Sequence, residues 1–155
     1  MPERKTIQRA QADKRQGKAP TTQAGEFVRE EIHHIRGGKH GARSAKQAIA
    51  IGLSKARRAG VKLPPPKKGT VSEKTRRSAA LAYQKGQAGV KPSPKRSRAR
   101  LQALRREGRQ SASKSALSRQ ARRGASGQSQ KPRSATTQRR APTRSTSRPA
   151  SRRSR

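Results

Sequence analysis

The sequence predicts a mostly α-helical protein in which two or three short helices form a marginal core and a long, disordered Arg/Ser-rich tail follows at the C-terminus. Twelve of the 18 apolar residues larger than alanine lie between Phe27 and Tyr83, so a core can form only in that part of the chain. They recur there at helical spacing and stand beside residues that begin and end helices. The last 30 residues offer too little apolar surface to offset the entropy of ordering.

The first predicted helix covers Gln23 to Arg36. Val28, Ile32 and Ile35 stand at positions i, i+4 and i+7, which places them on one face of a helix. The Gly37-Gly38 pair that follows is a stop signal. This segment is therefore expected to form a short amphipathic helix.

The second predicted helix begins with a capping box. Ser44 and Gln47 stand at the N-cap and N3 positions, where their side chains can accept hydrogen bonds from backbone N–H groups that lack a helical partner. Ile49, Leu53 and Ala56 then share one face. This is the clearest helix signal in the chain.

The end of this second helix is also predicted. Gly60 stands at the C′ position, where a left-handed backbone ends a helix, and Val61 at C″ can then touch Ala56 in a Schellman motif. The three prolines at 64–66 prevent the helix from continuing.

Weaker signals predict three further helices. Thr70 to Glu73 has the form of a second capping box, which begins a helix with a thin, alanine-rich face that runs to Gly86. Ser93-Pro94 is a good N-cap and N1 pair for a solvent-exposed helix that ends at Gly108. The segment from Ser113 to Arg123 is too short to be stable in water without packing.

These signals divide the chain into four parts. Residues 1–20 are predicted to be a basic flexible arm, 21–86 a small helical domain, 87–123 a basic linker with marginal helices, and 124–155 a disordered arginine-rich tail. The change in composition supports this division, because residues 87–155 hold 17 Arg but only 4 Lys, in a background of Ser, Ala, Pro, Gln and Gly.

The charge balance points to a polyanionic partner. The chain has 42 Lys and Arg against 7 Asp and Glu, which gives a formal net charge of +35. Lys and Arg that neutralise phosphates release condensed counterions and so gain free energy. Nucleic acid is therefore the expected partner, with DNA ahead of RNA.

Composition also excludes several kinds of site. With no Cys, no Trp, one Tyr and one Phe, the chain cannot form disulfides, thiolate zinc sites, cysteine nucleophiles or aromatic platforms for stacking bases. No apolar stretch is long enough for a membrane span or a signal peptide, so no membrane association is expected. The expected location is the cytoplasm, at the nucleoid.

The predicted nucleic-acid contacts are basic residues in three kinds of place. They lie in or beside the second predicted helix, in the helices predicted after it, or next to the glycine turn before it. They are Arg36, Lys39, Arg43, Lys46, Lys55, Arg57, Arg58, Lys62, Lys67, Lys68, Lys74, Arg76, Arg77, Lys95 and Arg96. The last two stand in a Ser-Pro-Lys-Arg unit that resembles units found in the tails of linker histones.

No catalytic or metal site is expected. His33 and His34 point about 100° apart on a helix, and His40 follows a Gly-Gly break, so no pair has the i, i+4 spacing with which two imidazoles chelate a metal. The carboxylates lie on short helices that cannot enclose a pocket to tune their pKa values. The protein is therefore expected not to be an enzyme and to need no cofactor.

Residues 34–63, HIRGGKHGARSAKQAIAIGLSKARRAGVKL, resemble the signature of a family of short, basic bacterial and phage proteins of unknown function. These proteins share a K/R-Q-A-I-A-I-small-L-S-x-A-R-R-A-G helix and are often labelled plasmid stabilisation proteins. The flanking EFVREEIH and PPPKKGT extend the resemblance over roughly residues 1–86. The label implies a role in plasmid maintenance. Toxins that share it have a sheet and catalytic residues, and neither is visible in this sequence.

The expected function is binding to DNA with little sequence preference, as in nucleoid-associated proteins. Two alternatives stay open. One is association with RNA or the ribosome, because ribosomal proteins also combine small helical cores with arginine-rich tails. The other is a non-enzymatic plasmid stabilisation accessory, which would need a protein partner docked on Phe27, Ile49 and Leu53. The oligomeric state also stays open.

Overall fold

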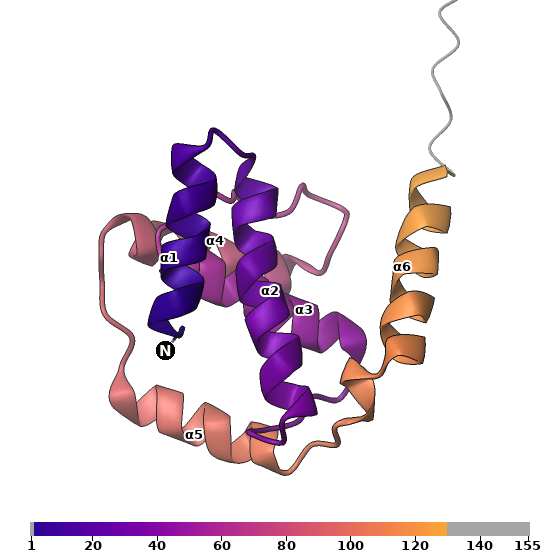
Figure 1. The fold of residues 1–155 in the computed structure, drawn as a ribbon. Helices are drawn as coiled ribbons and strands as arrows, with labels where there is room; N and C mark the ends of the chain where they lie inside the picture. Colours follow the sequence, from indigo (N-terminus) through magenta and orange to yellow (C-terminus); the bar gives the residue numbers. More distant parts are fainter. Residues whose placement is uncertain (1, 130–155) are drawn as a thin grey trace, which may run out of the picture.

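Helices make up most of residues 2–129, which are the residues that the computed structural model describes (Figure 1). They are α1 (Arg4–Arg15), α2 (Pro20–Arg36), α3 (Ala45–Arg58), α4 (Glu73–Gln87), α5 (Pro94–Arg105), the 3₁₀ turn η1 (Gln110–Ala112) and α6 (Lys114–Ser129). The predicted mostly α class is confirmed, although the described part has six α-helices, where the sequence predicted five segments and only two or three of them in the core. Of the predicted tail, residues 124–129 extend α6, and the rest lies outside the described residues.

The N-terminal segment departs most from the predicted organisation. Residues 1–20 are predicted to be a flexible arm, but α1 occupies most of this segment and lies antiparallel to α2 (Figure 1). Thr6 and Ala10 are buried, and Ile7 packs against a core cluster that includes Phe27 of α2. Both buried residues of α1 are small, and Ile7 is its one large apolar residue. The helix therefore lacks the repeated large apolar residues by which a helix is predicted from sequence.

Helices α2 and α3 meet through small side chains. A Cβ at Gly52 would lie 2.6 Å from the Cα of Val28, so only glycine fits at this contact. The buried residues of α3 are Ala45, Ala48, Gly52, Ala56 and Arg57. Ile49 and Leu53, predicted as the main apolar face, are half-buried beside this contact. The helices therefore pack through an alanine and glycine face, flanked by larger apolar side chains.

The predicted start of α3 is confirmed. The hydroxyl of Ser44 accepts a hydrogen bond from the Gln47 N–H at 3.2 Å. The Gln47 side chain accepts in return from the Arg43 N–H at 2.7 Å, one residue before the partner of a standard capping box. The two side chains thus satisfy two backbone donors at the helix N-terminus.

The predicted end of α3 is confirmed as a Schellman motif. Gly60 has a φ of +87°, and its N–H donates to the Arg57 carbonyl at 3.1 Å. The Val61 N–H donates to the Ala56 carbonyl at 3.1 Å, and both side chains are buried in one apolar cluster. This turn directs the chain away from α3 and towards α4.

Helix α4 begins later than predicted. Its N-cap is Ser72, which accepts a hydrogen bond from the Thr75 N–H at 3.3 Å. Thr70, the predicted cap, instead donates to the Lys67 carbonyl at 2.7 Å in the preceding turn. That local bond holds Thr70 outside the helix.

The predicted stop of α4 is an interior residue. Gly86 lies within the helix, and a Cβ there would collide with the carbonyl of Arg57 at the end of α3. Gly89, with a φ of +65°, follows the true end of the helix. Glycine at position 86 therefore serves the close approach of α4 to α3.

The segment predicted as a linker is partly built into the domain. Helix α5 begins at Pro94 as predicted, but the carbonyl of Leu104 accepts from the Gly41 N–H at 2.9 Å and that of Gly108 accepts from the Ala42 N–H at 3.0 Å. Ala112 in η1 is fully buried. These contacts attach residues 104–112 to the turn after α2, which sequence spacing alone did not indicate.

Two small apolar clusters form the core. The first joins Ala10, Ala24, Phe27, Ala56 and Val61, and the second joins Ile35, Ala42, Ala48 and Ala112. Between Phe27 and Ile35 on α2 stand two buried carboxylates, Glu30 and Glu31. Because Phe27 is 1% exposed, the predicted docking of a partner on this side chain does not fit the fold.

Two glycine substitutions test the proposed helix contact. Gly52→Ala should lower the free energy of unfolding by about 1–3 kcal/mol, because the added methyl group meets the Val28 backbone. Gly25→Ala in α2 meets nothing within 4 Å and should raise stability by about 0.5–1 kcal/mol. Urea unfolding followed by circular dichroism measures both. Equal effects of the two substitutions would contradict the close contact of α2 and α3.

Candidate nucleic-acid interface

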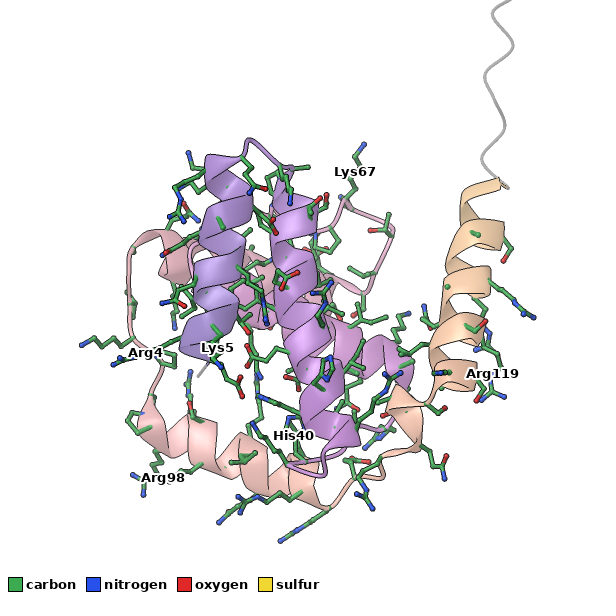
Figure 2. The ribbon with its side chains drawn as sticks, viewed as in Figure 1. Arg4, Lys5, His40, Lys67, Arg98 and Arg119 are labelled. Atoms are coloured by element: carbon green, nitrogen blue, oxygen red, sulfur yellow. The ribbon has the colours of Figure 1, made fainter. Side chains whose placement is uncertain are left out.

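Basic side chains extend from every side of the described structure. Figure 2 shows Arg4 on α1, Lys67 in the loop after α3, Arg98 on α5 and Arg119 on α6 pointing outward in different directions. All four residues are exposed. The positive charge is therefore spread around the molecule and is not concentrated in one groove.

The acidic side chains, in contrast, are all engaged within the domain. Each of the seven forms an ion pair with a basic side chain. Their Lys and Arg partners are Arg9, Lys18, Arg29, Lys39, Arg43, Lys55, Arg76 and Arg77. The other Lys and Arg side chains of residues 2–129 lie more than 4.0 Å from any carboxylate of that segment.

More than half of the predicted contact residues are available to a ligand. Within the described segment, eight are exposed and have no carboxylate partner: Lys46, Arg58, Lys62, Lys67, Lys68, Lys74, Lys95 and Arg96. Five of these lie between the end of α3 and the start of α4, at positions 58–74. Lys46 lies in the first turn of α3, and the last two lie in the first turn of α5.

A second group of predicted residues is accessible but already paired. Arg36 donates to the Ala112 carbonyl at 2.8 Å, and Lys39 donates to Glu3 at 2.8 Å. The 82% exposed side chain of Arg43 lies 3.7 Å from Glu107. Surface pairs of this kind are weak, so a phosphate can replace the carboxylate.

Glu73 holds the two remaining members of this group. Arg76 donates to both oxygens of Glu73, at 2.6 and 2.9 Å, and Arg77 lies 3.5 Å from the same carboxylate. The hydrogen bond from Arg76 lowers the pKa of Glu73, and the same bond raises the pKa of Arg76. These pairs lie within one turn of α4 and stabilise its N-terminal end.

Two of the predicted contact residues, Arg57 and Lys55, make their contacts within the fold. Arg57 is 7% exposed, and its guanidinium donates to the carbonyls of Leu63 at 3.2 Å and Pro64 at 3.3 Å. Burial lowers the pKa of Arg57. Lys55 lies beside the buried Glu30 and Glu31. Sequence analysis grouped both with the phosphate contacts because a run of basic residues does not reveal which side chains turn inward.

Sequence analysis also overlooked basic residues in segments with weak helix signals. Those exposed on α1, α5 and α6 include Arg4, Lys5, Arg98, Arg100, Arg119, Arg122 and Arg123. The basic character of these segments is visible in the sequence. These residues were left out of the predicted contacts because residues 1–20 were predicted to be an arm and 87–123 a linker.

The largest buried polar feature is a cluster of charged side chains around the C-terminal half of α2. The Lys55 ammonium lies 2.5 Å from Glu31 Oε2 and 3.7 Å from Glu30 Oε1. Glu30 Oε2 also accepts from the Glu3 N–H at 3.2 Å. Both carboxylates are at least 95% buried, so they depend on these partners for compensation.

Three further side chains complete this charged cluster. His40 Nε2 lies 3.3 Å from Glu31 Oε1, and His34 Nε2 lies 2.8 Å from Glu3 Oε1. Lys39 also binds Glu3 Oε1 at 2.8 Å. The pKa of Glu3 falls to about 2, first because Lys39 donates a hydrogen bond to it and second because His34 does.

Comparison with known proteins finds a match to one family model and indicates no function. Residues 13–68 match a family of unknown function (DUF6496). This segment is less than half of the chain and contains α2, α3 and the cluster of exposed lysines that follows them. The chain matches no curated protein and no solved structure. The expectation of plasmid maintenance therefore stays a prediction from resemblance.

None of the helices in the described segment has the length and apolar character required to traverse a lipid bilayer.

Replacing Lys55 tests its structural role. Lys55→Met keeps the aliphatic stem but leaves the buried Glu30 and Glu31 without their ammonium partner, so the free energy of unfolding should fall by about 3 kcal/mol. Lys46→Met, on the exposed side of the same helix, should change it by no more than about 0.5 kcal/mol. Urea unfolding distinguishes the two. A Lys55 variant as stable as the Lys46 variant would rule out a structural role.

The low pKa of Glu3 predicts a specific dependence on pH. A carboxyl group with a pKa near 2 in the folded state and about 4.3 in the unfolded state stabilises the fold above the unfolded value. That contribution is lost as the pH falls towards 2. The stability difference between the wild type and Glu3→Gln should therefore be full at neutral pH and shrink between about pH 4.3 and 2. Urea unfolding at a series of pH values measures it, and a constant difference across that range would contradict the assignment.

Proposed function

We propose that this protein binds nucleic acid, DNA ahead of RNA, without sequence preference and through Lys and Arg contacts to phosphates. The observation that carries the proposal is that acidic and basic side chains differ in how they are engaged. The seven carboxylates are engaged in ion pairs of the domain, while most Lys and Arg side chains are exposed around it. A duplex would supply the countercharge that the domain lacks.

The arrangement of the basic residues favours binding along the DNA backbone over recognition of a base sequence. Arg4, Lys67, Arg98 and Arg119 point in different directions, so one short duplex cannot contact them all at once (Figure 2). A sequence reader needs a defined helix or strand in a groove with a few side chains aimed at base edges. Positive charge on several sides instead suits contact with several duplex segments or wrapping by one. A nucleoid-associated role follows from this mode of binding, and its location would be the nucleoid.

The aromatic residues favour duplex over single-stranded ligands. Binding of single strands usually relies on exposed aromatic rings that stack on bases. Phe27 is buried, and Tyr83 is only half-exposed. Phosphate contacts are thus the main source of affinity in this proposal. Structured RNA also offers such phosphates, and the binding experiment separates it from DNA.

The loop after α3 provides the most direct test. Lys67 and Lys68 are exposed, and neither lies near a carboxylate of the described residues. The double variant Lys67→Ala/Lys68→Ala should bind duplex DNA more weakly, by a similar factor for unrelated sequences. The slope of log affinity against log salt should become shallower by up to about 1.8, since each lost phosphate contact accounts for about 0.9. Fluorescence anisotropy at several salt concentrations measures both quantities.

The matched control is Lys67→Arg/Lys68→Arg, which keeps the charge and should keep the slope. Two unrelated duplexes and one structured RNA serve as ligands in parallel titrations. A preference for one duplex that survives high salt would overturn the phosphate-dominated mechanism. Tighter binding to the RNA at every salt concentration would favour the ribosome-associated alternative.

A further inference from the structure

We propose that Glu31, His34 and His40 form a binding site for a divalent transition metal of the Zn²⁺ class. One ligand atom from each residue lies within 4.8 Å of the other two. Glu31 and His34 stand on α2, and His40 follows the Gly37-Gly38 turn that returns the chain beside the end of that helix (Figure 2). This inference does not depend on nucleic-acid binding.

His40 has one nitrogen fixed by the backbone and the other aimed at a carboxylate. Its Nδ1 lies 3.1 Å from the Gly41 carbonyl, which can only accept, so Nδ1 carries the hydrogen. Nε2 then faces Glu31 Oε1 at 3.3 Å. In a neutral imidazole this places a lone pair against a carboxylate oxygen. A positive centre between the two atoms, a proton or a metal ion, removes that repulsion.

In His34, as in His40, one ring nitrogen is held by an oxygen atom and the other is available. The oxygen is that of a carboxylate in His34, where His40 has the carbonyl of Gly41. Its Nε2 lies 2.8 Å from Glu3 Oε1 and donates to it, which leaves Nδ1 as the nitrogen available to an ion. Nδ1 faces Glu30 Oε1 at 3.9 Å. Metal-binding histidines usually donate their second ring nitrogen to a carboxylate or a carbonyl, and this chain supplies one of each. The two rings are nearly perpendicular, at 86°, with centroids 6.1 Å apart.

Glu31 can bind an ion without losing its present partner. Its Oε2 is held by Lys55, while Oε1 faces His40. Lys55 would then orient the ligating carboxylate. Two imidazoles with one carboxylate favour Zn²⁺ and its neighbours over Mg²⁺ or Ca²⁺, which prefer oxygen ligands, and a water molecule can complete the four ligands.

Burial and size are consistent with a structural metal site. Glu31 is fully buried, and His40 is 7% exposed. Bonds of about 2.0–2.2 Å place the ligand atoms of a tetrahedral ion roughly 3.4 Å apart, so side-chain adjustments of about 1 Å close the site. Spacing along one helix does not predict this site, because His40 lies beyond the helix. The Gly37-Gly38 turn that ends α2 also returns His40 to the side of that helix.

Titration of the tag-free, full-length protein with Zn²⁺ after removal of metals by a chelator tests this site. Calorimetry should show one Zn²⁺ per chain, and thermal unfolding should shift to higher temperature with Zn²⁺ but not with Mg²⁺. His34→Gln and His40→Gln should each weaken Zn²⁺ binding by at least ~100-fold. Glu3→Gln, which replaces the carboxylate beside His34 and Lys39 by a neutral amide, should weaken it by about 10-fold, because the amide is a poorer acceptor for the second nitrogen of His34.

His33→Gln is the matched control. His33 is an exposed neighbour of His34 on the same helix, and His33, His34 and His40 are the three histidines of a chain that has no cysteine. This variant should bind Zn²⁺ like the wild type. Circular dichroism establishes that each variant keeps its helices. If the His40 variant does not fold, the visible absorption spectrum of Co²⁺ bound to the wild type tests the site instead. A tetrahedral site gives intense absorption bands.

Any one of four results would overturn the proposal. The first two are no stoichiometric Zn²⁺ binding by the wild type and Zn²⁺ binding that a folded His40→Gln variant retains in full. The other two are equal losses in the His33 and His34 variants and weak, octahedral Co²⁺ bands.

Discussion

The pairing of Glu30 and Glu31 with Lys55 is the interaction on which the rest of the structure depends. Two carboxylates buried between the apolar clusters would be too costly without a nearby cation. Glu30 also accepts a hydrogen bond from the backbone N–H of Glu3, just before α1, and Glu31 lies beside the ring of His40, after α2. One charged cluster thus fixes the relative positions of α1, α2, α3 and the turn, a task that the few large apolar residues cannot perform alone.

Neighbouring basic residues show how the chain divides its cations between structure and surface. Arg57 turns inward and satisfies two carbonyls of the loop after α3, whereas Arg58, the next residue, is exposed. The two point about 100° apart on the helix, so one meets the loop and the other meets water. A small set of basic side chains therefore binds carboxylates and carbonyls within the fold, and the other basic side chains are exposed to solvent.

The sequence predicted elements with strong local signals and missed those that depend on distant contacts. Both ends of α3 were correct, because caps and Schellman turns depend on residues only a few positions apart. Helix α1 was missed, since its burial depends on small residues that meet α2. The parts that Glu3 and His40 play in the charged cluster were also missed, because these residues reach Glu30 and Glu31 only through the tertiary fold.

The alanine and glycine contact between α2 and α3 has a thermal consequence. Small side chains bury little apolar surface, and the heat-capacity change of unfolding grows with the apolar surface that becomes exposed. A core of this kind, with Phe27 and Ile35 as its largest fully buried apolar residues, gives a small heat-capacity change. The curve of stability against temperature is then broad and shallow. Such a domain changes little in stability across ordinary growth temperatures, and cooling weakens it less than it weakens a protein with a large apolar core.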